Sequence, residues 1–210
     1  KEYFDDGSID YQGKWKAGLP DGNGTAYHRK SPHKAYEGEF KKGNRTGRGK
    51  AYFEDGGIEY QGGWQKNLHH GQGTMYYPKT GNKMYVGELK NGKLDVQGTL
   101  YHHKTGYKWY VGEFKKGERD GHGKEYFDDG RIQYEGEWQE DLYHGHGTWY
   151  DRETGNKTYE GDFKKGHMDG RGKQYFDDGS TGYEGEWQKN LYHGHGTWYD
   201  RETGNKTYEG

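Results

Sequence analysis

A Tyr-x-Gly pattern that returns every 24 or 25 residues is the feature that most constrains how this chain folds. It begins at Tyr11 and last occurs at Tyr208, which gives eight complete repeats and a partial repeat at each end. A period of this length is typical of proteins that stack one supersecondary unit many times. We therefore expect one continuous array over residues 1–210 rather than ordinary globular domains.

Counting the Tyr as position 0, each repeat has Gly at position 2 and a large apolar residue at position 4. Because alternate residues of a strand face the same side, this pattern predicts a half-buried strand. The predicted structural positions are Tyr11, Gly13, Trp15, Tyr36, Gly38, Phe40, Tyr60, Gly62, Trp64, Tyr85, Gly87, Leu89, Tyr110, Gly112, Phe114, Tyr134, Gly136, Trp138, Tyr159, Gly161, Phe163, Tyr183, Gly185 and Trp187.

Position 7 is always Gly, Asn or Asp, as in Gly18, Asn67 and Asp141, and these residues tolerate positive φ best. It therefore marks a turn, after which a second strand reads Gly-x-Gly-x-x-Tyr. Asp-Asp-Gly or Thr-Gly-Asn closes the far end of that strand. Each repeat is thus a β-hairpin, and the fold class is all-β, an elongated single-layer antiparallel meander of tandem hairpins.

The glycines at positions 2 and 13 predict flat gaps in the strands, where a neighbouring Tyr or Trp ring lies against the backbone. One repeat departs from the pattern, since Val96 replaces the first Gly of Gly-x-Gly. We expect the local twist or packing to differ there.

Residues 134–161 return at 183–210 with two changes, Glu140 to Lys189 and Asp141 to Asn190. The repeat at this end of the chain is therefore a pair of hairpins, 49 residues long. Such fidelity indicates either a recent duplication or deliberate design.

Composition limits the class of protein further. Apolar residues are only 27%, which by itself suggests disorder, but aromatic residues are 17% and disordered chains are poor in them. The net charge is −2 and no basic block suited to nucleic acid occurs. No cysteine is present, which is compatible with the cytoplasm and does not exclude an extracellular location.

The segments Tyr134-Glu-Gly-Glu-Trp138 and Gly145-His-Gly147 closely resemble the MORN repeat (membrane occupation and recognition nexus), and the resemblance extends over the whole chain. It implies an elongated single-layer β-sheet. It also implies a non-enzymatic module: a protein–protein scaffold, a dimerising rod or a binder of membrane phospholipid, often attached to a separate catalytic domain.

Histidine pairs are the most suggestive candidates for chemistry. His144 with His146, and His193 with His195, are two residues apart and would leave one strand face, as zinc or copper ligands do. Equivalent positions elsewhere hold Asp21 and other unrelated residues, which favours exposed positions that simply accept His. We therefore expect no metal site. No carboxylate pair has acid–base spacing and a single-layer sheet offers no deep pocket, so we expect no catalytic residue and no cofactor either.

Two functions remain. The preferred one is a structural scaffold that contacts proteins through its aromatic stripe and associates with itself through cut strands at the sheet ends, giving filaments. The alternative is a peripheral module for anionic phospholipid headgroups, with the lysine pairs 41–42, 115–116 and 164–165 as the candidates.

Overall fold

The computed structural model describes residues Lys1–Gly210 and contains two compact units, Lys1–Gly106 (unit 1) and Tyr107–Gly210 (unit 2). Each unit contains nine strands and no helix. No helix of the chain therefore has the length and apolar character needed to span a membrane. The units are described one at a time below.

The strands alternate between the two arms of successive hairpins. Unit 1 contains β1 (Glu2–Tyr3), β2 (Ile9–Lys16), β3 (Leu19–Tyr27), β4 (Lys34–Lys41), β5 (Asn44–Tyr52), β6 (Ile58–Gln65), β7 (Leu68–Tyr76), β8 (Lys83–Lys90) and β9 (Lys93–Tyr101). Unit 2 contains β10 (Lys108–Lys115), β11 (Glu118–Tyr126), β12 (Ile132–Gln139), β13 (Leu142–Tyr150), β14 (Lys157–Lys164), β15 (His167–Tyr175), β16 (Thr181–Gln188), β17 (Leu191–Tyr199) and β18 (Lys206–Glu209).

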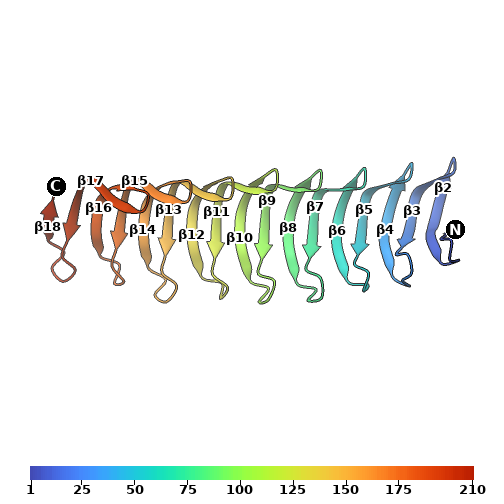
Figure 1. The fold of residues 1–210 in the computed structure, drawn as a ribbon, viewed down its shortest axis with the longest axis horizontal. Coiled ribbons are helices and arrows are strands. Elements are labelled where there is room, and N and C mark those ends of the chain that lie inside the picture. The colour runs from blue at the N-terminus through green and yellow to red at the C-terminus, as the bar shows by residue number, and fades with distance from the viewer. The chain divides into compact units, whose positions relative to one another are not determined.

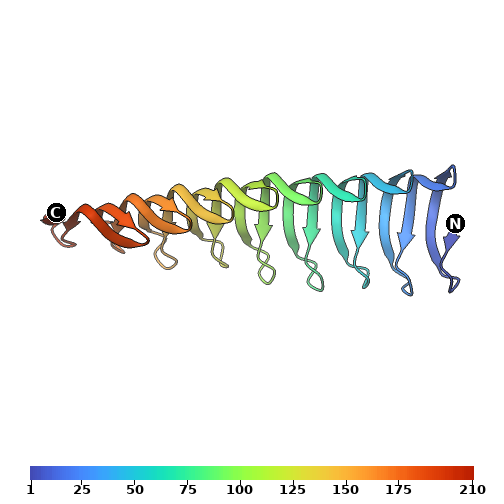
Figure 2. The same cartoon turned by 45° about the horizontal axis from the view of Figure 1, so that its top comes forward.

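Within each unit every strand pairs antiparallel with the next strand in sequence. Tight turns lie along one edge of the sheet and longer loops along the other (Figure 1). The strands are curved rather than flat (Figure 2), as expected for twisted β-sheet. The predicted all-β meander of tandem hairpins is confirmed.

The tight turns have two consecutive residues with positive φ, which is the type I′ geometry that suits the twist of a hairpin. Asn67 at position 7 has φ 67° and Asp141 has φ 64°, so the predicted turn position is confirmed. The residue before it was not predicted to be special. Yet Lys66 and Glu140 both have φ 50°, because the turn requires the left-handed conformation at both central residues.

The core is built from the position-0 tyrosines of the eight complete repeats, which are almost completely buried, whereas Tyr208 of the last partial repeat is exposed. The ring of Tyr134 lies flat on Gly136 and Gly147, which pair with each other across the hairpin. A Cβ atom on either glycine would overlap the tyrosine hydroxyl. That hydroxyl donates to the Glu137 carbonyl at 3.0 Å. The glycines thus leave a flat gap that a tyrosine ring fills, as predicted, and the ring belongs to the same hairpin as the glycines.

The aromatic residue at position 4 joins one hairpin to the next. Trp138 packs edge to face on its own Tyr134 and on Tyr110 of the preceding repeat, each with ring centroids 5.3 Å apart. The same arrangement recurs with Phe163 against Tyr159 and Tyr134. Because these rings contact two repeats each, the hairpins do not complete their cores alone.

The second strand of each hairpin contains a bulge at position 11, where the residue has positive φ. Seven repeats have Gly there, and Val96 adopts the same conformation with φ 58°. We expected the local twist or packing to differ at Val96, but the backbone there has the same conformation as in the other repeats. A β-branched residue thus occupies a left-handed position that costs backbone strain.

A second contact between repeats explains one of the two differences between the copied segments. Asp141 Oδ1 accepts hydrogen bonds from the backbone N–H and Nε of Arg119 in the preceding repeat, at 2.9 and 3.1 Å. Asn190 Oδ1 accepts only from the backbone N–H of Met168, at 2.8 Å. A carboxylate therefore faces the Arg119 cation in the first segment, whereas in the second a neutral amide stands there, with Asn190 Nδ2 2.8 Å from His167 Nδ1. Nothing in the structure explains the change from Glu140 to Lys189.

Candidate interaction groove

The side of the sheet opposite the buried tyrosines is polar, and in unit 2 it forms a groove of about 980 Å³. Strands β13 to β18 supply the residues that line it. The charged and aromatic side chains are His146, Glu160, Arg171, Lys173, Tyr175, Glu184, Glu186, His195, Tyr199, Lys206 and Glu209. Six strands at about 4.8 Å spacing extend over about 24 Å, so the groove is a trough rather than a compact cavity.

Tyrosines at position 16 form a second aromatic row, and Tyr175 and Tyr199 lie in the groove. The Tyr175 hydroxyl donates to Glu160 Oε2 at 2.9 Å. Burial, followed by this hydrogen bond, raises the pKa of Tyr175 to about 12. The Lys157 ammonium also donates to Glu160 at 2.9 Å, and this bond is the main cause of the lowered pKa of Glu160. Sequence reasoning predicted one aromatic stripe and missed this second row.

From β14 to β16 the sign of charge alternates from strand to strand, whereas β18 carries both signs. The charged residues are Glu160 on β14, Arg171 and Lys173 on β15, Glu184 and Glu186 on β16, and Lys206 and Glu209 on β18. His146 lies opposite Asp162 on the adjacent strand, with Nδ1 3.6 Å from Oδ1. Arg171 lies opposite Glu186 in the strand register, but their side chains form no ion pair. The guanidinium of Arg171 has no hydrogen-bond or ion-pair partner within the protein. It is exposed, and therefore available to a ligand.

The carboxylates at position 3 have a structural role. Glu137 accepts a hydrogen bond from the backbone N–H of His146 at 3.2 Å, and Asp162 accepts one from the N–H of Arg171 at 3.0 Å. These N–H groups follow the bulge, where the regular ladder is interrupted. The carboxylates therefore complete the hydrogen bonding of the bulge and do not form an acid–base pair.

The polar side of unit 1 is less charged. Its groove measures about 590 Å³ and is lined by Glu37, Arg48 and Lys50 together with several uncharged residues. Among these are Gln61 and Val86, at the position where unit 2 carries Glu160 and Glu184. The groove of unit 2 is thus the stronger candidate for binding a charged ligand.

A buried ion pair lies on the aromatic side of unit 2. Arg119 Nη1 donates to Glu125 Oε1 at 3.0 Å, and both side chains are less than 15% exposed. The same guanidinium lies 4.0 Å from the centre of the Trp138 ring, and Tyr143 donates to the other oxygen of Glu125. Every charge is partnered, which indicates packing rather than catalysis.

The histidine pairs do not meet further ligands. His144 and His146 flank the bulge at Gly145, and no group of three or more His, Cys, Asp or Glu side chains could hold a metal ion. His69 is different, since it stacks on Tyr60 with centroids 3.8 Å apart. Burial lowers the pKa of His69.

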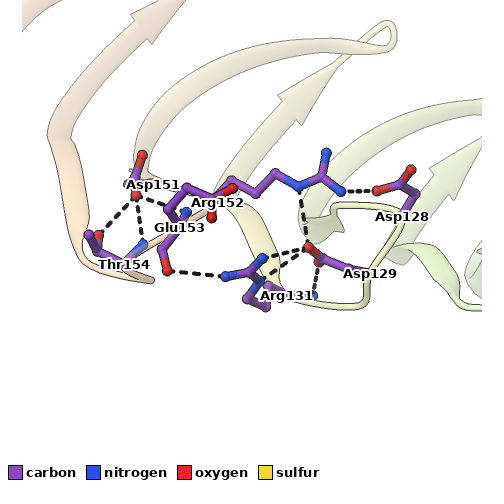
Figure 3. A network of polar contacts seen from close by, with 7 residues as sticks. All are labelled: Asp128, Asp129, Arg131, Asp151, Arg152, Glu153 and Thr154. Carbon is purple, nitrogen blue, oxygen red and sulfur yellow. Dashed lines mark hydrogen bonds and ion pairs between the residues drawn. The ribbon is translucent and has the colours of Figure 1, made fainter.

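The loops at the edge of unit 2 carry a polar network between repeats (Figure 3). Arg152 contacts Asp128 and Asp129 of the preceding loop, and Arg131 donates to Asp129 at 2.8 Å. Hydrogen bonds from Arg131 lower the pKa of Asp129 to about 2. This network joins successive hairpins at their loop ends.

Of the predicted structural positions, the tyrosines and the apolar residues at position 4 are buried, except Trp15, which is 38% exposed. The glycines range from buried to exposed, as in Gly13. None of the charged side chains or tyrosines that line the groove was among the predicted positions. Their signal in the sequence is the regular Tyr at position 16 and the alternating charges at positions 3 and 12.

Together, the buried tyrosine and tryptophan rows and the open polar groove define a tandem β-hairpin repeat protein. A family model, the MORN repeat, matches eight segments of the chain, and the chain belongs to this family. The matched residues are 11–28, 36–58, 60–81, 85–103, 110–130, 134–152, 159–181 and 183–201. Comparison with curated proteins gives no match. MORN repeats are general, mostly non-catalytic modules that often take part in protein or membrane interactions.

Proposed function

We propose that this chain is a non-enzymatic binding module that holds a segment of a protein partner in the polar groove of unit 2. The observation that carries the proposal is the unpaired guanidinium of Arg171 beside Tyr175 and Tyr199 in a trough about 24 Å long. Arginine and tyrosine are the residues most enriched at the energetic centres of protein interfaces.

The length of the groove favours a polypeptide over a small molecule. An extended segment rises about 3.3 Å per residue, so about seven residues would fill the trough. A small ligand would leave most of the lining unused. The alternating charges of the groove suit a partner that carries both signs of charge.

The test is affinity isolation of partners with the intact chain, followed by binding measurements with each partner. Arg171→Glu changes the charge of the groove, and Lys164→Glu makes the same change in the same repeat at an exposed turn. We expect the first variant to weaken binding at least about tenfold and the second to leave it unchanged. Equal effects of the two variants would exclude the groove as the binding surface.

The predicted end-to-end association through edge strands stays a prediction. Electron microscopy and light scattering over a concentration series test it. Because such pairing uses backbone hydrogen bonds, any filaments should persist in high salt. Uniform single particles at every concentration would contradict it.

The second candidate is binding to anionic lipid headgroups. The observation in its favour is that Lys41, Lys42 and their neighbours are exposed and unpaired at the turns of unit 1. Flotation with anionic vesicles at low and high salt is the measurement. Absence of binding at low salt would exclude this function.

A further inference from the structure

The hairpin turns of unit 1 form an edge with only positive charge. This turn edge consists of four turns, residues 16–19, 41–44, 65–68 and 90–93, and contains no Asp or Glu. None of its lysines takes part in an ion pair, and all are exposed. They are Lys16, Lys41, Lys42, Lys66, Lys90 and Lys93.

The loops of unit 2 form an edge with the opposite charge. This loop edge consists of four loops, residues 127–131, 151–156, 176–180 and 200–205, with eight carboxylates and three arginines. The arginines are engaged with Asp128, Asp129 and Asp178, as Figure 3 shows for the first two. The side chains of Glu153, Asp177 and Glu202 remain exposed without an ion-pair partner.

The loops of unit 1 and the turns of unit 2, by contrast, each carry charges of both signs. The loops of unit 1 contain four carboxylates and four Lys or Arg residues. The turns of unit 2 contain five lysines together with Glu118, Glu140 and Asp141. The net charge is therefore +6 at the turn edge of unit 1 (six lysines) and −5 at the loop edge of unit 2 (eight carboxylates, three arginines). It is zero at the loops of unit 1 (four against four) and only +2 at the turns of unit 2 (five lysines, three carboxylates).

The two charged edges also match in spacing. Both have one hairpin end per repeat, and two strands at about 4.8 Å set that interval at about 9.6 Å. Four turns can thus face four loops in register. We propose that the turn edge of unit 1 in one copy of the chain binds the loop edge of unit 2 in a second copy.

This inference goes beyond the proposed function, because it uses the hairpin ends and leaves the groove free. The structure favours a second copy over a membrane for a geometric reason. The lysines follow the narrow edge of a single-layer sheet, so they form a line rather than an area. A line of cations is best complemented by a line of anions with the same interval, which the loop edge supplies.

Sedimentation velocity of the intact chain over a concentration series is the first measurement. Raising the salt concentration from about 0.01 M to about 1 M shortens the screening length from about 30 Å to about 3 Å. We expect self-association at low salt and at least a tenfold weakening at high salt. End-to-end pairing by backbone hydrogen bonds would not show this salt dependence.

Charge reversal identifies the surfaces. The turn-edge variant carries Lys41→Glu, Lys42→Glu, Lys90→Glu and Lys93→Glu. The loop-edge variant carries Glu153→Lys, Asp177→Lys and Glu202→Lys. The matched control carries Lys115→Glu, Lys116→Glu, Lys164→Glu and Lys165→Glu, which are four reversals at the turns of unit 2. Circular dichroism verifies the fold of each variant.

Each edge variant alone should lose self-association, and the control should retain it. An equimolar mixture of the two edge variants should associate again, because each then presents the complement of the other. Loss of association in the control, failure of the mixture to associate, or a wild-type chain that stays monomeric at low salt would each overturn the proposal. Vesicle binding by a monomeric wild-type chain would assign the turn edge to lipid instead. The Arg171→Glu variant should still self-associate, because the groove is not part of the proposed contact between copies. Self-association and binding of a partner in the groove can therefore be tested separately.

Discussion

Replacing Val96 by glycine should stabilise unit 1, because Val96 has φ 58° at the bulge where the other seven repeats have glycine. The left-handed conformation costs an L-residue roughly 1–2 kcal/mol. The side chain of Val96 is 52% exposed, so its removal sacrifices little buried surface. Glycine adds roughly 0.5–1 kcal/mol of unfolded-state entropy, which offsets part of the gain. The net stabilisation should be about 0.5–1 kcal/mol.

The reverse change provides the control. Gly71 occupies the same position one repeat earlier with φ 70°, and a Cβ atom there would meet nothing within 4 Å. Gly71→Val therefore introduces backbone strain without a steric clash, and should destabilise the unit by a similar amount. Urea denaturation followed by tryptophan fluorescence measures both variants. If Val96→Gly is neutral or destabilising while Gly71→Val has no cost, the strain argument is wrong.

Three further changes test the packing. Gly147→Ala places a Cβ atom against the Tyr134 hydroxyl and should displace the ring, with a loss of about 1–3 kcal/mol in denaturation experiments. Glu125→Ala leaves the buried guanidinium of Arg119 with fewer partners and should cost about 2 kcal/mol. His69 has a lowered pKa in the folded state, so the unfolded state binds a proton first and stability should fall as pH drops below 6.5. His69→Leu should remove that part of the pH dependence in thermal melts.

Each of these predictions has a control in the same sheet. Thr148→Ala, next to the substituted glycine, changes the polar side and should have little effect. Glu118→Ala removes an exposed carboxylate near the buried pair. His122→Leu, which removes an exposed histidine, is the matched variant for His69→Leu. A control as costly as its partner variant would contradict the assigned contact.

The repeat pattern was sufficient to predict the secondary structure, the position of the turns and the buried tyrosines. This was possible because each of these depends on local chemistry that the repeat displays many times. Glycine and asparagine at position 7 tolerate positive φ, and alternation places Tyr134, Gly136 and Trp138 on one side. No contact between distant residues was needed to find them.

The irregularities of the strands, by contrast, could not be predicted from the repeat pattern. Lys157 and Glu160 are three residues apart, so simple alternation places them on opposite sides of the strand. The register shift beside Tyr159 leaves Thr158 unpaired and brings the two side chains together. A bulge of this kind depends on how neighbouring strands align, which period-two counting does not reveal.

Tertiary structure alone decided how the repeats recognise one another. It showed that the Tyr134 ring covers the glycines of its own hairpin, while Trp138 makes the contact with the preceding repeat. It paired Asp141 with Arg119, a contact 22 residues apart in sequence. The groove and the charged edges arise the same way, because they exist only after successive hairpins are stacked in register. A single repeat read along the chain contains their residues but not their arrangement in space.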